Sequence, residues 1–534
     1  MSKIKTSSTA EYFSKNLQQV GFSSPLKAVL TTLKEAVDNS LDACEEDGIL
    51  PHIKVQISKI GKGSSRNTDL VKIVIEDNGP GLSAQDLPAV FGEYLASSKF
   101  GKGQCSRGQQ GIGISAATTW AQLTNATGVY VESKTKKMPQ ALSMVIDVDI
   151  KNNKGLVKKK TNVKWTSKKH GLKAAFIIDG KVQLNGDGGL ITYLEGTALV
   201  NPHLEMHYTL LDNDPVHVKR VSDIIPRVPP PTLPHPHTMK LGEFITYSHL
   251  YGKMSTSKFL KTGFSRVSDA TVKELFKKGK IKSSLMNLPL PKLSDADFKK
   301  IFESLQETPL MNPQTNSVLI IGEEALAQSI HRIGDVDFFS VVTRKPRICD
   351  FKPVVIEVAM ARLSDVKGKE EASLQLLRFA NRVPLQFDKS SCALTKAVES
   401  VNWKAYGLQQ SKNSVPGGPY VLAISMTSPF IKFKNASKET IDASDELVEE
   451  IRKALIQTGQ KLGRYIRKEK KEFDLERKIQ HIEKFAPILV GGLVKITKAP
   501  ASRKKKAELG LMKILGRDAK SAEAELTQAK EKLK

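Results

Sequence analysis

The spacing of apolar and polar residues divides the chain into stretches with helical and with strand periodicity. Between Leu26 and Leu41 apolar residues recur every three or four positions, which predicts an amphipathic helix over residues 26–44. Four later stretches alternate apolar and polar residues, which predicts strands. These stretches are Ile53–Ile57, Val71–Ile75, Leu142–Ile150 and Leu172–Ile178. The first third is therefore expected to pair a few helices with a mostly antiparallel sheet, an α+β arrangement.

A proline-dense segment at residues 224–237 interrupts this pattern. Proline cannot continue a helix or a central strand, so we expect a domain boundary there. The lysine-rich region that follows, to about residue 308, shows helical spacing. Ser268 precedes one expected helix, and Ser294 with Asp297 forms a capping-box-like start for another.

Strand signals return from Ser317 onward, separated by helical segments such as residues 394–401. A long helix is expected from about Asp442, with its apolar stripe at Leu447, Ile451, Leu455, Leu462 and Ile466. The strand segments are SVLIIG, DFFSVVTRKP, PVVIEVAMA and YVLAISMTSP. The expected domains are 1–228, 229–310, 311–470 and a basic helical or mobile tail at 471–534.

Composition adds a basic charge to this picture. The 534 residues carry 82 lysines and arginines against 56 acidic residues, a formal charge of +26 that favours a polyanionic partner such as nucleic acid or an anionic membrane surface. Four scattered cysteines form no CxxC pair, which fits a reducing compartment. The first residues show no secretory signal, and no apolar stretch reaches the roughly 20 residues of a membrane span. We therefore expect a soluble intracellular protein without membrane association.

Three motifs in chain order carry the candidate chemistry. Glu35 and Asn39 lie four residues apart on the expected helix, so both face one side and could orient a water and hold Mg²⁺. Asp77–Gly81 (DNGPG) ends a strand in a turn that lets a ligand approach the backbone. Arg107–Gly113 places glycines before a helix N-terminus, an anion site suited to polyphosphate. Each motif alone also fits an ordinary solvated helix or turn; the ordered triple is specific.

Two other nucleotide motifs are excluded. The chain has no GxxxxGK[ST], so it is not a P-loop ATPase, and Arg107–Gly113 lacks the βαβ context and the acidic residue of a dinucleotide site. The ordered triple instead resembles the Bergerat ATP-binding pattern of gyrase, the 90-kilodalton heat-shock chaperone, histidine kinases and the mismatch-repair protein MutL.

The resemblance is closer to the B subunits of DNA topoisomerase VI, over about residues 10–466. It is carried by KEAVDNSLDA, SSKFGKGQCSRGQQGIGISAA, TALVNPH, VTRKPR, LLRFANRVPLQFD and VNWKAYGL. It implies an α+β multidomain fold with a Bergerat ATPase domain on a mixed, mostly antiparallel sheet. A small helix-two-turns-helix domain would follow, and then an α/β transducer domain that ends in a long helix.

The resemblance also implies roles for single residues. Glu35 would be the general base, Asn39 would bind Mg²⁺, and Asp77 would recognise the adenine amine of ATP. Lys438 would reach the γ-phosphate from the transducer domain. The remaining expected nucleotide contacts are Gly79, Gly81, Ser98, Lys99, Arg107, Gly108, Gln109, Gln110, Gly111, Ile112 and Gly113.

The sequence differs from the family pattern at one position. The family has Gly-Thr at the start of a late strand in the ATP domain, where this chain has Gly171-Leu172. Leucine cannot donate a hydroxyl hydrogen bond toward the adenine, so we expect modestly weaker nucleotide binding.

DNA cleavage is expected to reside in another polypeptide. Four D-x-D pairs are present, and none is expected to bind a catalytic metal. The first is expected on an outward strand face, the second in a turn and the third in a helix cap, and the fourth lies just before a strand with no acidic cluster to complete a metal site. The pairs are Asp147/Asp149, Asp212/Asp214, Asp295/Asp297 and Asp335/Asp337. The resemblance supplies a topoisomerase VI A subunit as the cutting partner.

The implied assembly is a heterotetramer of two A and two B subunits. ATP would dimerise the N-terminal domains around double-stranded DNA, in the cytoplasmic nucleoid or, for a eukaryotic source, the nucleus. Lysines between 258 and 282 are compatible with DNA contacts or with a solvated face. Two alternatives remain: a Bergerat ATPase acting as a chaperone or mismatch-repair clamp, and a DNA-binding scaffold without turnover.

Overall fold

The computed structural model describes residues 7–96, 103–108, 111–165, 169–364, 374–435, 437–507 and 509–510. The chain divides into two compact units. The first unit contains Met1–Asn402 and Gln409–Thr458; the second contains Trp403–Leu408 and Gly459–Lys534.

The first unit opens with an eight-stranded sheet in the order β5-β4-β3-β6-β2-β1-β7-β8. Neighbouring strands are antiparallel except β1 and β7, which run parallel. The α+β arrangement and the four predicted strands are therefore confirmed. The strands are β1 (His52–Lys62), β2 (Asp69–Glu76), β3 (Val129–Lys134), β4 (Ala141–Asp149), β5 (Lys154–Val163), β6 (Gly171–Gly180), β7 (Glu205–Leu210) and β8 (Val216–Val218).

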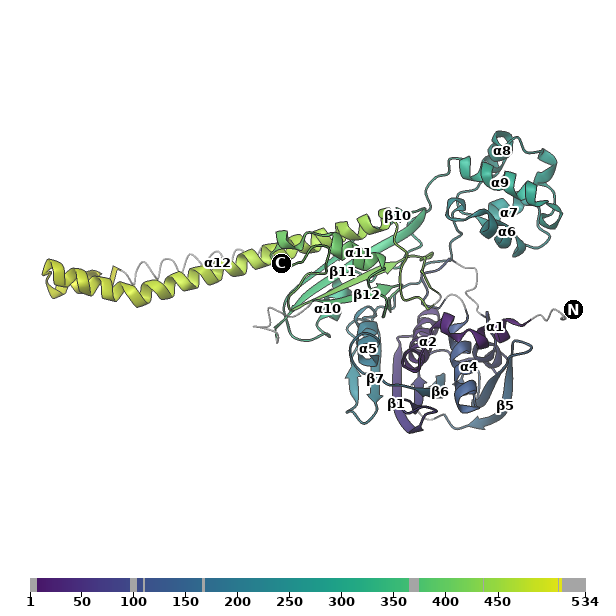
Figure 1. The fold of residues 1–534 in the computed structure, drawn as a ribbon, viewed down its shortest axis with the longest axis horizontal. Helices are drawn as coiled ribbons and strands as arrows, with labels where there is room; N and C mark the ends of the chain where they lie inside the picture. The colour runs from purple at the N-terminus through teal and green to yellow at the C-terminus, as the bar shows by residue number, and fades with distance from the viewer. Residues whose placement is uncertain are drawn as a thin grey trace. The chain divides into compact units, whose positions relative to one another are not determined.

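Helices α2 and α4 pack beside each other on this sheet, as Figure 1 shows. The predicted helix forms α2 (Pro25–Glu46) because Ser24 caps its first turn, its hydroxyl accepting from Lys27 N at 3.3 Å, and Pro25 occupies the first helical position. Its apolar stripe from Val29 to Leu41 is buried in the core against the sheet. The other helices are α1 (Thr9–Lys15), α3 (Asp86–Gly92), α4 (Gly113–Asn125) and α5 (Leu190–Leu199).

A helical region after the proline-rich segment has a core of its own, centred on phenylalanines such as Phe244 and Phe259. Its helices are α6 (Leu241–His249), α7 (Thr256–Gly263), α8 (Asp269–Lys278) and α9 (Asp295–Glu307). The capping predictions are confirmed. The Ser268 hydroxyl accepts from the first turn of α8, and Ser294 and Asp297 form a reciprocal capping box at α9.

A second sheet of six strands follows, in the order β10-β11-β14-β12-β13, with β9 also paired to β11. Three of the four strands predicted after Ser317 are present as β9, β11 and β14. The strands are β9 (Val336–Thr343), β10 (Arg347–Cys349), β11 (Lys352–Leu363), β12 (Gln375–Ala380), β13 (Val383–Pro384) and β14 (Tyr420–Thr427). The helices are α10 (Glu323–Ile330) and α11 (Ala393–Ser400).

The strand predicted at SVLIIG is wrong. These residues form an irregular segment whose Val318 and Leu319 are buried beside Cys105. The backbone N–H groups of Ile321 and Gly322 donate to the Glu357 carboxylate at 3.0 and 2.8 Å. A side chain therefore takes the donors that a neighbouring strand would otherwise accept.

The predicted long helix is α12 (Asp445–Thr497), which begins three residues later than expected and passes from the first unit into the second. Its stripe residues Leu447, Ile451, Leu455 and Leu462 are buried. The second unit also contains the short helix η6 (Trp403–Tyr406) and a further helical stretch at 501–507. Within the described residues, no helix has both the length and the apolarity that a membrane crossing requires.

Candidate functional site

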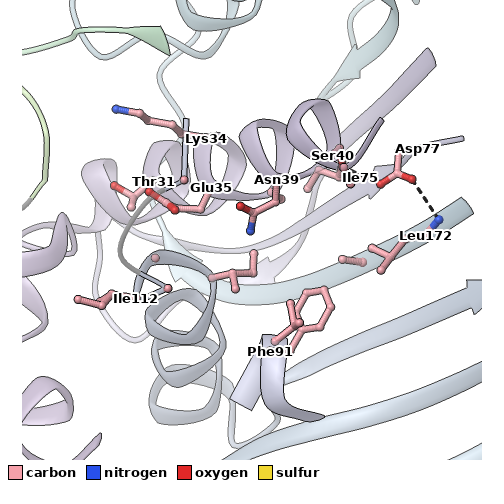
Figure 2. A pocket seen from close by; sticks show the side chains of 18 of the residues that line it. Thr31, Lys34, Glu35, Asn39, Ser40, Ile75, Asp77, Phe91, Ile112 and Leu172 are labelled. Atoms are coloured by element: carbon pink, nitrogen blue, oxygen red, sulfur yellow. Dashed lines mark hydrogen bonds between the residues drawn. The ribbon is translucent and has the colours of Figure 1, made fainter. Parts of the chain in front are cut away.

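A pocket in the first unit brings the three sequence motifs together. It is lined by α2, by the turn after β2, by the start of α4 and by the loop that holds Lys438. Figure 2 shows Thr31, Glu35 and Asn39 on the pocket side of α2, opposite the strand residues Ile75 and Leu172. One wall is thus polar and the floor is apolar, an arrangement suited to a ligand with an apolar ring and a charged end.

Glu35 lies against the first residue of α4. A Cβ at Gly113 would overlap the Glu35 carboxylate, so only glycine lets the carboxylate approach the helix start. The N-cap residue of α4, Ile112, makes no side-chain cap, so that cap does not satisfy the first N–H groups of the helix. The helix thereby presents donors to the pocket, as expected for an anion site.

Asp77 is fixed by four groups around it. Its Oδ1 accepts from Gly79 N at 2.9 Å and from Leu172 N at 3.2 Å, while its Oδ2 accepts from the Ser40 hydroxyl at 2.8 Å. Asp77 N in turn donates to Leu172 O at 2.9 Å. With Asp77 only 4% exposed, its carboxylate is held rigidly at the pocket floor, and an ionised carboxylate has a further lone-pair site for a ligand donor.

Glycines at two turns make this arrangement possible. Gly81 has φ +72°, and a Cβ there would overlap the carbonyl of Lys134. A Cβ at Gly171 would meet the carbonyl of Asp77 itself. The side chain of Leu172, the residue that departs from the family pattern, lies in the pocket floor beside Asp77.

The glycine-rich segment lies over the pocket only in part. Gly108, Gly111, Ile112 and Gly113 line it, and a Cβ at Gly108 would lie 3.3 Å from the Asn39 amide oxygen. The predicted contacts Ser98, Lys99, Gln109 and Gln110 lie outside the described residues.

Lys438 reaches this segment from a loop that precedes α12. The loop is closed by Lys434 N donating to Thr440 O at 3.0 Å, and Lys438 sits in it with φ +55°. Its ammonium donates to the carbonyl of Arg107 at 3.0 Å, and the residue lines the pocket. A lysine more than 300 residues from Glu35 in the sequence is therefore brought to the same pocket.

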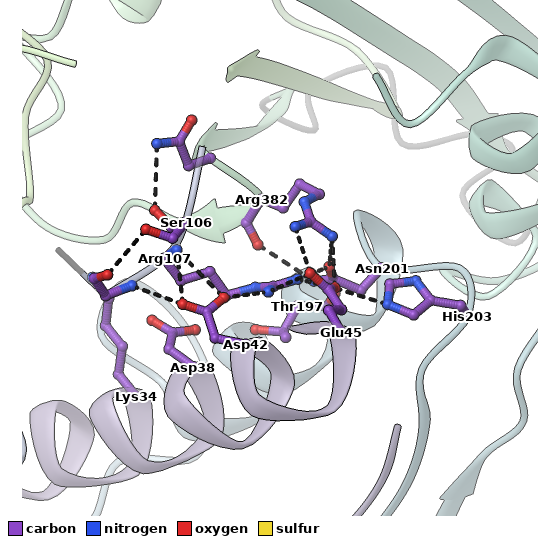
Figure 3. A network of polar contacts seen from close by, with 12 residues as sticks. Lys34, Asp38, Asp42, Glu45, Ser106, Arg107, Thr197, Asn201, His203 and Arg382 are labelled. Atoms are coloured by element: carbon purple, nitrogen blue, oxygen red, sulfur yellow. Dashed lines mark hydrogen bonds and ion pairs between the residues drawn. The ribbon is translucent and has the colours of Figure 1, made fainter. Parts of the chain in front are cut away.

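The Arg107 guanidinium takes part in a buried ion network, which Figure 3 shows. It pairs with Asp42 at 2.7 Å and with Glu45 at 2.7 Å, both on the last turns of α2. Glu45 also pairs with Arg382 at 2.7 Å and contacts His203 Nε2 at 2.8 Å. The network joins α2, the glycine-rich segment, the chain after α5 and the second sheet.

Arg382 occupies a strained position to make this contact. Together with Asn381 it forms the two-residue turn between β12 and β13, and both residues have positive φ, 48° for Asn381 and 64° for Arg382. Arginine in this conformation costs about 1 kcal/mol or more. The strain is sustained because both guanidinium nitrogens donate to Glu45, each at 2.7 Å.

Electrostatics explain why the network stays charged. Burial favours the protonated form of Glu45, yet Arg107 and Arg382 hold its pKa well below its ordinary value. Burial also opposes the charge on Arg107, but Glu45 and Asp42 outweigh it and raise the pKa of the guanidinium. Two carboxylates and two guanidiniums therefore balance in a region that excludes water.

Asp38 lies one helical turn before Asp42 and behaves differently. Burial raises its pKa to about 7, against the opposing influence of Lys34 and Arg107. The Tyr193 hydroxyl donates to Asp38 Oδ1 at 3.1 Å. This carboxyl therefore titrates near neutral pH, within one turn of Glu35 on the same helix.

The D-x-D pairs do not form metal sites among the described residues. Asp147 is buried, not outward-facing as predicted, because its Oδ1 accepts from Gly128 N at 2.8 Å. Asp297 caps α9, as expected. Within the described part of the chain, the one group of three potential ligands is His52, Glu205 and His207.

The network was missed by sequence reasoning, although a signal for it exists. Arg107, Asn201, His203 and Arg382 all lie within the stretches that carry the family resemblance, and Glu45 lies just beyond one of them. His203 and Arg382, which had no assigned role in these stretches, were candidates for a shared buried contact.

Comparison with known proteins adds the following. Residues 28–174 match the family model described as "Histidine kinase-, DNA gyrase B-, and HSP90-like ATPase", and residues 313–478 match "Topoisomerase VI B subunit, transducer". The B subunit of type 2 DNA topoisomerase 6 from Archaeoglobus fulgidus is 35% identical over 487 residues, which cover 91% of this chain and 79% of the relative.

The protein of the same name from Pyrococcus horikoshii is 30% identical over 573 residues, 99% of this chain and 98% of the relative. Among solved structures, the ATPase region of Saccharomyces cerevisiae topoisomerase II aligns with a TM-score of 0.41 and 11% identity, covering 86% of this chain and 97% of that one.

Proposed function

We propose that this chain, which belongs to the family of type 2 DNA topoisomerase 6 B subunits, binds and hydrolyses ATP in the pocket between α2, β2 and α4 to gate DNA passage. The convergence of Glu35, Asp77 and the start of α4 on one pocket carries this proposal. Family membership replaces the chaperone and mismatch-repair interpretations, whereas a scaffold without turnover remains an outcome of the experiments below.

Different parts of the pocket bind different parts of ATP. Asp77, held by Gly79, Leu172 and Ser40, accepts a hydrogen bond from the adenine amine. The N–H groups at the start of α4 bind phosphate oxygens. Glu35, placed against that helix start, accepts a proton from the attacking water.

The donors present fit a magnesium ion. Asn39 offers an amide oxygen one turn from the Glu35 carboxylate on the same pocket face, and Mg²⁺ prefers a few oxygen donors that leave room for water and phosphates. Asn39 would hold the ion, which would supply charge neutralisation for the phosphates.

Lys438 and Arg107 couple the pocket to the second sheet. The Lys438 ammonium contacts the glycine-rich segment, and the residue also lines the pocket. Its transfer from the Arg107 carbonyl to the γ-phosphate would move the loop before α12 when ATP binds. Arg107 then acts by anchoring this segment through Glu45 and Arg382 rather than by touching phosphate.

The helical region and the rest of α12 supply the partner surfaces. We assign double-stranded DNA to the helical region α7–α9, where Lys258, Lys273, Lys277, Lys280 and Lys282 are exposed. Lys261 contributes less because it pairs with Asp269 at 2.6 Å. A protein that acts on DNA would be located at the nucleoid, or in the nucleus if the source is eukaryotic.

The A subunit is assigned to an apolar stripe on the last part of α12. Phe485, Ile488, Leu489, Leu493 and Ile496 are 47–81% exposed and lie on one helical face. Two A and two B subunits would form the active assembly, and ATP would dimerise the N-terminal domains.

Reconstitution tests the proposal as a whole. The purified chain and an A subunit are incubated with supercoiled plasmid, with and without ATP and Mg²⁺. Relaxation that requires both subunits and both additions is expected. The Lys438→Ala variant should bind ATP yet lose relaxation, because its coupling contact is gone. Relaxation by the chain without ATP, or normal relaxation by Lys438→Ala, would contradict the gating proposal.

A further inference from the structure

Four potential metal ligands gather at one end of the first sheet, outside the pocket. In the register of the strands, His52 on β1 pairs with Glu205 on β7, and His207 on β7 pairs with His217 on β8. Residues two apart on a strand share a face, and directly paired residues project on the same side. All four side chains therefore stand on one face across three neighbouring strands.

Their polar atoms converge. One ligand atom from each of His52, Glu205 and His207 lies within 4.8 Å of the others. Glu205 Oε1 is 3.1 Å from His217 Nε2 and 3.8 Å from His207 Nε2. The rings of His207 and His217 are stacked with centroids 3.9 Å apart. One carboxylate oxygen is thus the meeting point of two imidazole nitrogens, with a third ring beside them.

The surroundings hold these groups in place. The other oxygen of Glu205 accepts two hydrogen bonds from Arg220, at 3.2 and 2.7 Å, which leaves Oε1 turned toward the histidines. His52 N donates at 2.8 Å to the side chain of Asn78, whose amide also donates to Leu50 O at 3.0 Å. A partner such as Arg220, hydrogen-bonded to a ligand side chain, orients that ligand in metal sites.

We propose that His52, Glu205 and His207 bind a borderline transition-metal dication, Zn²⁺ in the first instance, with His217 as the fourth ligand. Three imidazoles and one carboxylate are a donor set that Zn²⁺ accepts in tetrahedral geometry. Zn–N bonds of about 2.1 Å bring ligand atoms to about 3.4 Å from one another. The His207 and His217 side chains are 38% exposed, and their rings would have to turn to bring their nitrogens to this spacing.

The ion would clamp the β7–β8 hairpin to the start of β1. Because His52 N is bonded to Asn78, the residue after Asp77, the clamp would act beside the turn that shapes the pocket floor. Its role would be structural, since the ligand set is complete without a water. Bound metal would stabilise the folded chain increasingly as its concentration rises above its Kd.

The test uses the full chain, freed of metal by a chelator and then titrated with Zn²⁺ by calorimetry and with Co²⁺ by visible absorption. We expect one ion per chain, a tetrahedral Co²⁺ spectrum and a Zn²⁺-dependent rise in Tm. His207→Ala and His217→Ala should each weaken Zn²⁺ binding at least about 10-fold. Both side chains are partly exposed, so these variants should fold, and far-UV circular dichroism checks this.

His249→Ala, which removes an exposed histidine on α6, is the matched control and should leave Zn²⁺ binding unchanged. Absence of stoichiometric binding at micromolar Zn²⁺, or binding that persists in both His207→Ala and His217→Ala, would overturn the proposal and leave an ordinary His–Glu hydrogen-bond cluster.

Discussion

The Glu45–Arg382 pair provides a quantitative test of the buried network. Both side chains are about 1% exposed and joined by two bonds of 2.7 Å. Arg382→Gln removes one of two guanidiniums that balance Glu45 and Asp42, and breaking such a pair costs about 3–5 kcal/mol. Glu45 keeps Arg107 and His203 as partners, so we expect a loss at the lower end, about 3 kcal/mol. At about 2–4 °C per kcal/mol this corresponds to a Tm decrease of roughly 6–12 °C.

A double-mutant cycle isolates the interaction. Glu45→Gln should cost a similar amount because it leaves two guanidiniums facing Asp42 alone. The double variant restores neutrality, since Arg107 and Asp42 still pair at 2.7 Å, so its loss should fall short of the summed single losses by about 2 kcal/mol. Lys62→Gln, which breaks a pair whose lysine is 93% exposed, is the control and should change Tm by less than about 1 °C. Additive losses in the double variant would refute the reasoning.

Three further predictions concern the pocket, pH and the contact with the A subunit. Leu172→Thr should tighten ATP binding about 5-fold in calorimetry, the equivalent of one added hydrogen bond, and an unchanged affinity would show that leucine is not a defect. The pKa of Asp38 is about 7 in the folded chain and has its ordinary value of 3.8 in the unfolded chain. The free energy of unfolding should therefore fall as the pH rises between these two values, because the folded state binds the proton more tightly. The Tm of Asp38→Asn relative to wild type should therefore rise from about pH 4 to about pH 7, and a pH-independent difference would contradict the pKa. Leu489→Glu should weaken the association with the A subunit at least about 10-fold in a pull-down titration, whereas Gln480→Glu on the opposite face of α12 should not; equal effects would remove the stripe as the contact.

The periodicity of apolar residues predicted most of the helices and strands, because each predicted element buries one face. The helix at α2 and the strands β1, β2, β4 and β6 each satisfy a single repeat, about 3.6 or 2, and each repeat is visible in the sequence. SVLIIG has the composition of a strand, but the backbone N–H groups at its end donate to the carboxylate of Glu357 instead of to a neighbouring strand. Glu357 is 35 positions from Gly322. Competition of this kind depends on tertiary contacts that periodicity does not encode.

The pocket could be anticipated because its motifs are short and ordered, whereas its electrostatic support could not. Glu45, Arg107 and Arg382 are separated by 62 and 275 positions, and nothing local marks them as partners. Arg107 shows the consequence. Its place in a glycine-rich segment suggested a phosphate contact, but two carboxylates on α2 bind its guanidinium. Asp147 was expected outside because the strand alternates, yet a backbone N–H from the start of β3 binds it within the fold.

The central claim is that Glu35 activates water in a pocket where Asp77 binds the adenine. Its most direct test is to measure ATP binding by calorimetry and phosphate release in parallel, for wild type, Glu35→Gln and Asp77→Asn. Glu35→Gln should bind ATP within about 3-fold of wild type while turnover falls at least about 10²-fold, since only the base is lost. Asp77→Asn should lose binding itself. Wild-type turnover in Glu35→Gln, or no ATP binding by the unaltered chain, would contradict the account.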